Sequence, residues 1–140
     1  MAYFGNISSI QTKSTKIDLL TNADIESEKY IINQIKKYYP NHSILSEEKG
    51  ELARATDYQW IIDPLDGTTN FTHNLPIFSV SIGLKIKGKT YCGVVYNPAA
   101  DKCFYAEENK GSYLNNNKIS CTSSNTLTES LLATGFPYIH

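Results

Sequence analysis

The sequence is short of several features, and each shortage excludes a class of protein. Only three of the 140 residues are cysteines, an odd number with no C-x-x-C pair. Neither a disulfide framework nor a zinc site is therefore expected, and reduced thiols favour a cytoplasmic location. Neither sign of charge is in excess, because 13 basic and 14 acidic side chains leave a net charge of -1. This balance argues against direct nucleic-acid binding.

Long hydrophobic runs are also missing. The first ten residues, MAYFGNISSI, have no basic stretch and no apolar core followed by a small-residue cleavage site, so a secretory signal is not expected. The apolar runs elsewhere are only a few residues long, whereas about 20 apolar residues are needed to cross a bilayer. We therefore expect one soluble domain over residues 1–140 that does not associate with membranes.

The hydrophobic pattern predicts one helix followed by strands. Apolar side chains recur at helical spacing over residues 24–39, after the capping side chains of Thr21 and Asn22 and before Pro40. Beyond this helix come runs rich in aromatic and β-branched residues, separated by glycine and asparagine turns. The predicted strands cover residues 43–45, 58–62, 77–86, 90–96, 102–107 and 111–114. This order predicts an α+β fold with helix packed on a mainly antiparallel sheet.

The segment 60–71, WIIDPLDGTTNF, places two carboxylates close together. A buried strand is expected to deliver Asp63 at its end, where a carboxylate would otherwise be an unusual choice. Pro64 removes a backbone N–H and is expected to turn the chain. Asp66 then falls beside Asp63, so that both carboxylates can face one point.

The residues that follow suit an anion. Gly67 permits close approach of the backbone, and residues 68–71 are expected to open a helix whose free N–H groups face the two carboxylates. Two carboxylates beside a helix N-terminus suit a magnesium ion bridged to a phosphate group. A D-P-x-D-G turn that binds nothing remains the alternative interpretation, since turns use the same residues.

Two further acidic features have ordinary explanations when each is taken alone. Glu47 and Glu48 follow the predicted strand 43–45, and such a pair usually forms a solvated charged loop. Asp24 lies at the start of the predicted helix, where it can cap the helix and interact with its dipole.

Taken together, these positions resemble the inositol monophosphatase family in order and spacing. The family signature is an aromatic residue followed by D-P-[IL]-D-G-T-x-x-F, and residues 60–71 reproduce it throughout. The resemblance begins at K-x-x-x-I-D-L-L-T-N-A-D, residues 13–24. It continues through Y-P-N-H-S-I-L-S-E-E, F-S-V-S-I-G and G-V-V-Y-N-P to L-A-T-G-F-P-Y. The resemblance implies the N-terminal domain of the layered sandwich that the family shares with fructose-bisphosphatase-like enzymes.

The resemblance also implies a role for each matching residue. The implied metal ligands, for two or three Mg2+ ions, are Glu48, Asp63, the Leu65 carbonyl and Asp66. The implied phosphate and substrate contacts are Leu65, Asp66, Gly67, Thr68 and Lys13. The implied catalytic residues are Thr68, Asp24 and Glu48, with the Thr68 hydroxyl and Asp24 orienting and helping to deprotonate a metal-bound water. Glu47 is expected to point away, since neighbouring side chains alternate along an extended chain.

The implied activity is magnesium-dependent hydrolysis of a phosphate monoester, inositol 1-phosphate to myo-inositol and phosphate. Two alternatives stay open. One is a non-catalytic regulatory protein, since some bacterial relatives act on transcription by binding the transcription machinery. The other is a phosphatase for another sugar phosphate, such as fructose bisphosphate.

The sequence departs from the family in one respect. Family members are roughly twice as long, and their second half carries a W-D-x-A-A signature. That signature is absent here, because Trp60 is the only tryptophan and is followed by Ile61. A fragment, a product of a split or decaying gene and one part of a two-piece enzyme are all open interpretations. We expect the chain to be incomplete or inactive alone, and to form a homodimer or associate with a missing C-terminal half.

Overall fold

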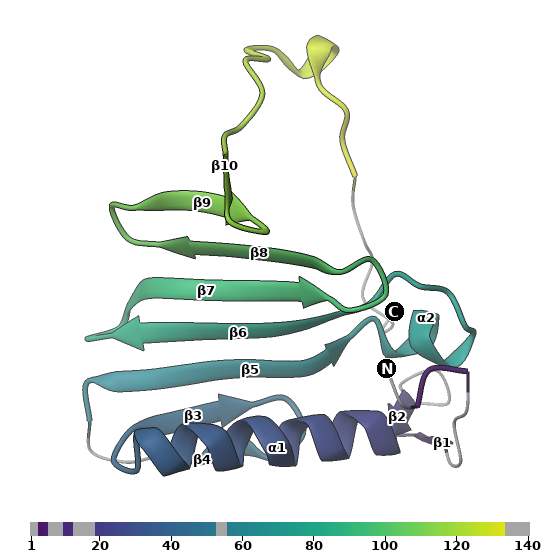
Figure 1. Cartoon of the computed structure of the whole chain (residues 1–140), viewed down its shortest axis with the longest axis vertical. Helices are drawn as coiled ribbons and strands as arrows, with labels where there is room; N and C mark the ends of the chain where they lie inside the picture. The colour runs from purple at the N-terminus through teal and green to yellow at the C-terminus, as the bar shows by residue number, and fades with distance from the viewer. Residues whose placement is uncertain (1–2, 6–9, 13–18, 53–55, 134–140) are drawn as a thin grey trace.

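The computed structural model describes residues 3–5, 10–12, 19–52 and 56–133 of the chain. One long helix, α1 (Asn22–Tyr38), packs against one end of a large sheet (Figure 1). The strands of this sheet are β3 (Ser43–Ser46), β4 (Gly50–Leu52), β5 (Tyr58–Asp66), β6 (Ser79–Ile86), β7 (Lys89–Asn97), β8 (Lys102–Glu107), β9 (Gly111–Leu114) and β10 (Asn117–Ile119). A short helix, α2 (Thr68–Thr72), follows β5, and a 3-10 turn lies at Leu127–Glu129. A separate pair of strands, β1 (Ile10–Thr12) and β2 (Leu19–Thr21), precedes α1.

The sheet has eight strands in the order β10-β9-β8-β7-β6-β5-β3-β4. All neighbours are antiparallel except β3 and β5, which are parallel because the chain reverses into the edge strand β4 and reverses again before it runs along β5. The predicted α+β class with a mainly antiparallel sheet is therefore confirmed. Four strands were not predicted, β1, β2, β4 and β10. Each has three residues, too few to show an alternating pattern.

The predicted helix is present and begins two residues early. Thr21 is its N-cap: its hydroxyl accepts hydrogen bonds from the backbone N–H groups of Ala23 and Asp24, and the Asp24 carboxylate accepts one from the Thr21 N–H. This reciprocal capping box satisfies donors that the first turn of a helix leaves open. At the other end Tyr39 closes the helix before Pro40, and Lys36 and Lys37 complement the helix dipole.

The core consists of two clusters. One joins α1 to β3 and β5 through Ile32, Ile35, Ile44 and Ile62. The other surrounds α2 and contains Ala23, Leu65, Phe71 and Phe78, with the ring of Phe4 packed on both phenylalanines.

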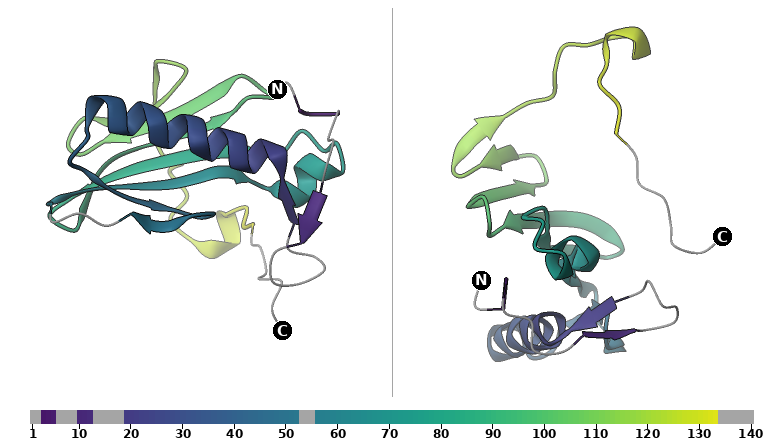
Figure 2. Two further views of the ribbon diagram at one scale, coloured as in Figure 1. Left: turned by 90° about the horizontal axis from the view of Figure 1, so that it is seen from below. Right: turned by 90° about the vertical axis from the view of Figure 1, so that its right-hand side faces the viewer.

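Side-chain alternation along the strands separates the two faces of the sheet. Ile62 packs toward α1, so its neighbours Ile61 and Asp63 face the other side, which we call the open face. Strand pairing extends this face across β6, β7 and β8 through Ser81, Gly83, Gly93, Val95, Phe104 and Ala106. Among the described residues, no helix covers the open face, whereas α1 lies across the opposite side at the β3–β5 end (Figure 2).

Neither helix in the described part of the chain has both the length and the apolar composition needed to cross a bilayer.

Candidate active site

A bulge in β5 brings Asp63 and Asp66 onto the same face of the sheet. Asp63 pairs with Ser81 of β6, and Asp66 pairs with Ser79, so three steps along β5 match two steps along β6. In a regular strand, residues three apart point to opposite faces, but the extra residue of a bulge restores the alignment. The Ser79 hydroxyl also donates to Asp66 Oδ2 at 3.3 Å. The prediction of two adjacent carboxylates is confirmed. The predicted turn at Pro64 is not found, because β5 runs through it.

Glu47 joins these two aspartates, contrary to the expectation that it points away. In the parallel pair, Leu45 lies opposite Ile61 and Ser46 opposite Ile62, and the Glu47 N–H donates to the Ile62 carbonyl at 3.1 Å. The same register continued by one residue places Glu47 beside Asp63 on the open face. Alternation was the correct rule, but the expectation assigned the wrong parity, because it took Glu48 as the metal ligand from the family resemblance and therefore turned Glu47 to the opposite face. The assignment of Glu48 as a metal ligand stays a prediction.

The carboxylates of Glu47 and Asp66 strongly perturb Asp63. Burial raises the pKa of the partly buried Asp63, and the nearby carboxylates of Glu47 and Asp66 raise it further, to about 7 in total. A hydrogen bond from the Leu65 N–H to Asp63 Oδ1, 3.1 Å long, opposes this shift only in part. Like charges held together in this way favour a proton or a cation between them. This all-oxygen donor set suits a hard divalent cation such as Mg2+.

Among the described residues, no group of three or more His, Cys, Asp or Glu side chains has the geometry to hold a metal ion. Two of the carboxylates, Glu47 and Asp63, nevertheless line a shallow depression on the open face with Leu45, Ile61, Ser81 and Gly83, whereas Asp66 lines another depression with Gly67 and Ser79. The residues present therefore fit a divalent cation in chemistry and in the face that they share.

Thr68 is the first residue of α2 and follows Asp66 by two residues. Its hydroxyl is 3.0 Å from Asp24 Oδ1 and 3.0 Å from the Leu65 carbonyl oxygen, and it can donate to either. Asp24 is only 1% exposed, and its other oxygen accepts from the hydroxyl and N–H of Thr21. The capping residue Thr21 thus holds the Asp24 carboxylate in place, and Asp24 in turn orients the Thr68 hydroxyl. The expected pairing of Thr68 with Asp24 is present, although neither role in catalysis is tested by it.

Gly67 connects β5 to α2 in a conformation that favours glycine. Its φ angle is +87°, and a Cβ atom here would lie 3.0 Å from the Ile77 carbonyl oxygen. The predicted helix after Gly67 is confirmed as α2, Thr68–Thr72. Lys13, the remaining residue predicted at the site, lies outside the described residues.

Sequence reasoning missed two contributors to this site. The orientation of Glu47 could have been found by extending strand 43–45 by one residue and counting alternation from Ile44. Ser79 carried no signal, since its contact with Asp66 depends on the bulge.

Comparison with known proteins identifies the family. The sequence profile described as "Inositol monophosphatase family" matches residues 1–140, and the chain belongs to this family. A relative named "Nus factor SuhB" from Pasteurella multocida is 46% identical over 127 residues, covering 90% of this chain and 47% of the relative. A relative named "Inositol-1-monophosphatase" from Synechocystis is 44% identical over 136 residues, covering 96% of this chain and 47% of the relative. The resemblance seen in the sequence is confirmed.

Solved structures show the same fold. The inositol monophosphatase of Anabaena superposes with a TM-score of 0.80 at 44% identity, covering 83% of this chain and 46% of that protein. A protein titled "IMPase/NADP phosphatase complexed with Mg2+ and phosphate" superposes with a TM-score of 0.77 at 26% identity, covering 84% and 45%. The chain thus spans about half the length of the relatives and structures that it matches.

Proposed function

We propose that this chain forms the magnesium-binding half of a phosphate monoesterase that acts on inositol 1-phosphate. The observation that carries the proposal is the convergence of Glu47, Asp63 and Asp66 on one face of the sheet, next to Thr68. A relative named for inositol-1-monophosphatase and a neighbour complexed with Mg2+ and phosphate support this choice. Which sugar phosphate is hydrolysed depends on residues that contact the alcohol, so fructose bisphosphate and related esters remain competing substrates.

The proposed ligands are the carboxylates of Asp63, Asp66 and Glu47 and the carbonyl oxygen of Leu65. Asp63 lies between the other two carboxylates and is the natural bridging ligand if two or three ions bind. Bound magnesium would lower the pKa of a coordinated water and neutralise charge on the phosphate and the leaving oxygen. The chain's own contribution is to hold these oxygens on a rigid sheet before the ion arrives.

The remaining residues would orient the water and the phosphate. The Thr68 hydroxyl, which donates to Asp24, is proposed to orient a water beside the carboxylates and, with Asp24, to help deprotonate it. The backbone N–H groups of Gly67 and Thr68 are proposed to face the phosphate oxygens, because the first turn of α2 leaves such donors without helical partners. Lys13 is proposed as a further phosphate contact on the family resemblance alone.

An assay of phosphate release tests the proposed hydrolysis. We expect little turnover of inositol 1-phosphate by residues 1–140 alone, since the chain spans about half of its relatives. A fusion of this chain to the C-terminal half of the Synechocystis relative is expected to release phosphate only when magnesium is present. The control is the same half of the relative without this chain. A folded fusion that hydrolyses none of several sugar phosphates would contradict the proposal.

Substituting each residue of the glutamate pair in turn tests whether Glu47 or Glu48 is the metal ligand. Glu47→Gln is expected to raise the magnesium concentration needed for half-maximal activity of the fusion by about tenfold or more, because it removes a charged ligand beside Asp63. Glu48→Gln makes the same chemical change at the next residue. It is expected to raise the magnesium concentration for half-maximal activity less than Glu47→Gln does. Magnesium titrations of both variants give the comparison. The reverse order would restore Glu48 as the ligand.

A regulatory function is the second proposal, and the name of the Pasteurella relative, "Nus factor SuhB", favours it. In that case the family fold would serve as an interaction surface for the transcription machinery. A variant without metal ligands separates the two functions, because it would lose hydrolysis and keep binding to the partner.

The open face supports the proposed association with a second half or a second copy. Val95 and Phe104 are 41% and 39% exposed on this face, and a groove of about 350 Å³ runs across β6 to β9 between them and the small residues Gly83, Gly93 and Ala106. An apolar surface of this kind is usually covered in the assembled protein.

A further inference from the structure

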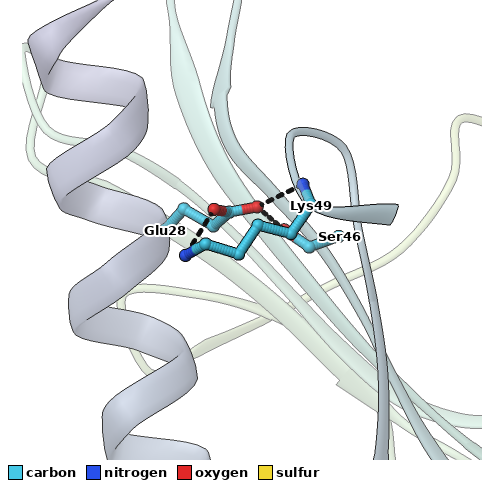
Figure 3. Close-up of polar contacts among 3 residues, drawn as sticks. All are labelled: Glu28, Ser46 and Lys49. Carbon is cyan, nitrogen blue, oxygen red and sulfur yellow. Dashed lines mark hydrogen bonds and ion pairs between the residues drawn. The ribbon is translucent and has the colours of Figure 1, made fainter. Parts of the chain in front are cut away.

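Glu28 is a buried anion that the proposed chemistry does not use. It lies on α1 and is only 1% exposed. Its Oε1 atom accepts a 2.5 Å hydrogen bond from the Ser46 hydroxyl and a 2.9 Å bond from the Lys49 backbone N–H. Its Oε2 atom lies 2.9 Å from the Lys49 ammonium group (Figure 3). All three contacts therefore go to one short segment far along the chain.

That segment is the turn that carries the two glutamates. Ser46 is the last residue of β3, and Lys49 immediately precedes β4, so only Glu47 and Glu48 lie between the two partners of Glu28. Ser46 points toward α1, and Glu47, one residue on, points to the open face. A contact that holds Ser46 against the helix thereby also directs Glu47 toward Asp63.

A buried carboxylate in this position contributes little net free energy to folding. Removing a charge from water costs free energy that its partners only partly return, and an apolar side chain could fill the same space. Burial would raise the pKa of Glu28, but hydrogen bonds from Lys49 and Ser46 outweigh this and hold it below its ordinary value, so the group stays ionised. What the anion supplies is a fixed geometry, since three donors converge on one carboxylate.

We propose that Glu28 is a positioning residue that clamps the turn 46–49 and so holds the Glu47 carboxylate beside Asp63. The proposal rests on the proposed metal site. It states that contacts with α1, and not only pairing within the sheet, hold the turn after β3 in place. Glu28 itself touches neither metal nor substrate. Its removal should therefore act on the preorganisation of the site and weaken metal binding without removing a ligand.

The test compares two serine hydroxyls on one strand. Ser46→Ala and Glu28→Gln both weaken the clamp, whereas Ser43→Ala removes a part-buried hydrogen bond, from Ser43 Oγ to the Tyr58 carbonyl at 3.0 Å, at the far end of β3. Mn2+ titrations of this chain, followed by electron paramagnetic resonance, report affinity, and thermal melts report stability. We expect about a tenfold loss of Mn2+ affinity for the two clamp variants. Ser43→Ala should also lower the melting temperature, by less because its bond is to a neutral carbonyl, and should leave Mn2+ affinity within about twofold.

Amide hydrogen exchange provides a second test of the clamp that does not depend on metal binding. Amide hydrogen exchange at Glu47, whose N–H donates to the Ile62 carbonyl, should speed up at least about tenfold in Glu28→Gln and stay unchanged in Ser43→Ala. Equal affinity losses in all three variants, or unchanged exchange at Glu47, would overturn the clamp. If the unaltered chain binds no Mn2+, the proposed metal site fails, and hydrogen exchange alone then decides whether Glu28 positions the turn.

Discussion

Asp63→Asn is expected to abolish magnesium binding by this chain, with a loss of affinity of at least about 100-fold. Asp63 is partly buried and interacts with the carboxylates of both Glu47 and Asp66, so in the proposed site its loss should weaken a cation held by either neighbour. The amide that replaces it has no charge and one oxygen fewer for coordination. Isothermal titration calorimetry with Mg2+ measures the loss. In the active fusion, losing several kcal/mol of charge stabilisation corresponds to about a 10³-fold fall in phosphate release.

The control for this variant is Asp57→Asn. It makes the same chemical change at an exposed carboxylate, whose Oδ2 atom lies 4.0 Å from the Lys87 ammonium group. Magnesium binding should survive it. Without metal, Asp63→Asn should unfold at the same temperature as the unaltered chain or a higher one, because it removes one of three crowded carboxylates. Magnesium affinity that persists in Asp63→Asn would place the metal elsewhere.

Asp24→Ala is expected to cause the largest loss of stability among the site residues. The 1%-exposed carboxylate accepts from the N–H of Thr21 at 2.8 Å, from the hydroxyl of Thr21 at 2.5 Å, and from the hydroxyl of Thr68 at 3.0 Å. Loss of the capping box costs about 1 kcal/mol, and buried donors left without a partner cost about 1–3 kcal/mol each. A total of about 3–5 kcal/mol should lower the melting temperature by roughly 10 °C or more.

Thr68→Val is the matched comparison for Asp24→Ala. It removes the Thr68 hydroxyl and keeps the capping box, so the melting temperature should fall far less. Thermal melts followed by circular dichroism separate the two variants. In the fusion, Thr68→Val should lower turnover with nearly the same magnesium requirement, because the proposed role of the hydroxyl is to orient water and not to bind the metal. Similar small stability losses in both variants would mean that Asp24 serves the site and not the fold.

The sequence by itself determined the elements that depend on neighbours along the chain. Helix α1 follows from the apolar spacing between its capping residues and Pro40, and the capping box needs only Thr21 and Asp24, three residues apart. The segment D-P-L-D-G-T predicted that Asp63, Asp66 and Thr68 lie where a strand ends and a helix begins, since its residues are neighbours along the chain.

Only the tertiary structure decided which face each carboxylate occupies. Asp66 reaches the side of Asp63 because a bulge inserts one extra residue opposite β6, and no local pattern announces where a register shift falls. Glu47 reaches the same side because β3 pairs in parallel with β5 in one particular register. Glu28 meets Ser46 and Lys49 only after α1 packs on the sheet, 18 to 21 residues away along the chain. Side chains alternate with a period of two, so a shift of one residue in pairing exchanges the two faces, and pairing partners are chosen by contacts distant in sequence.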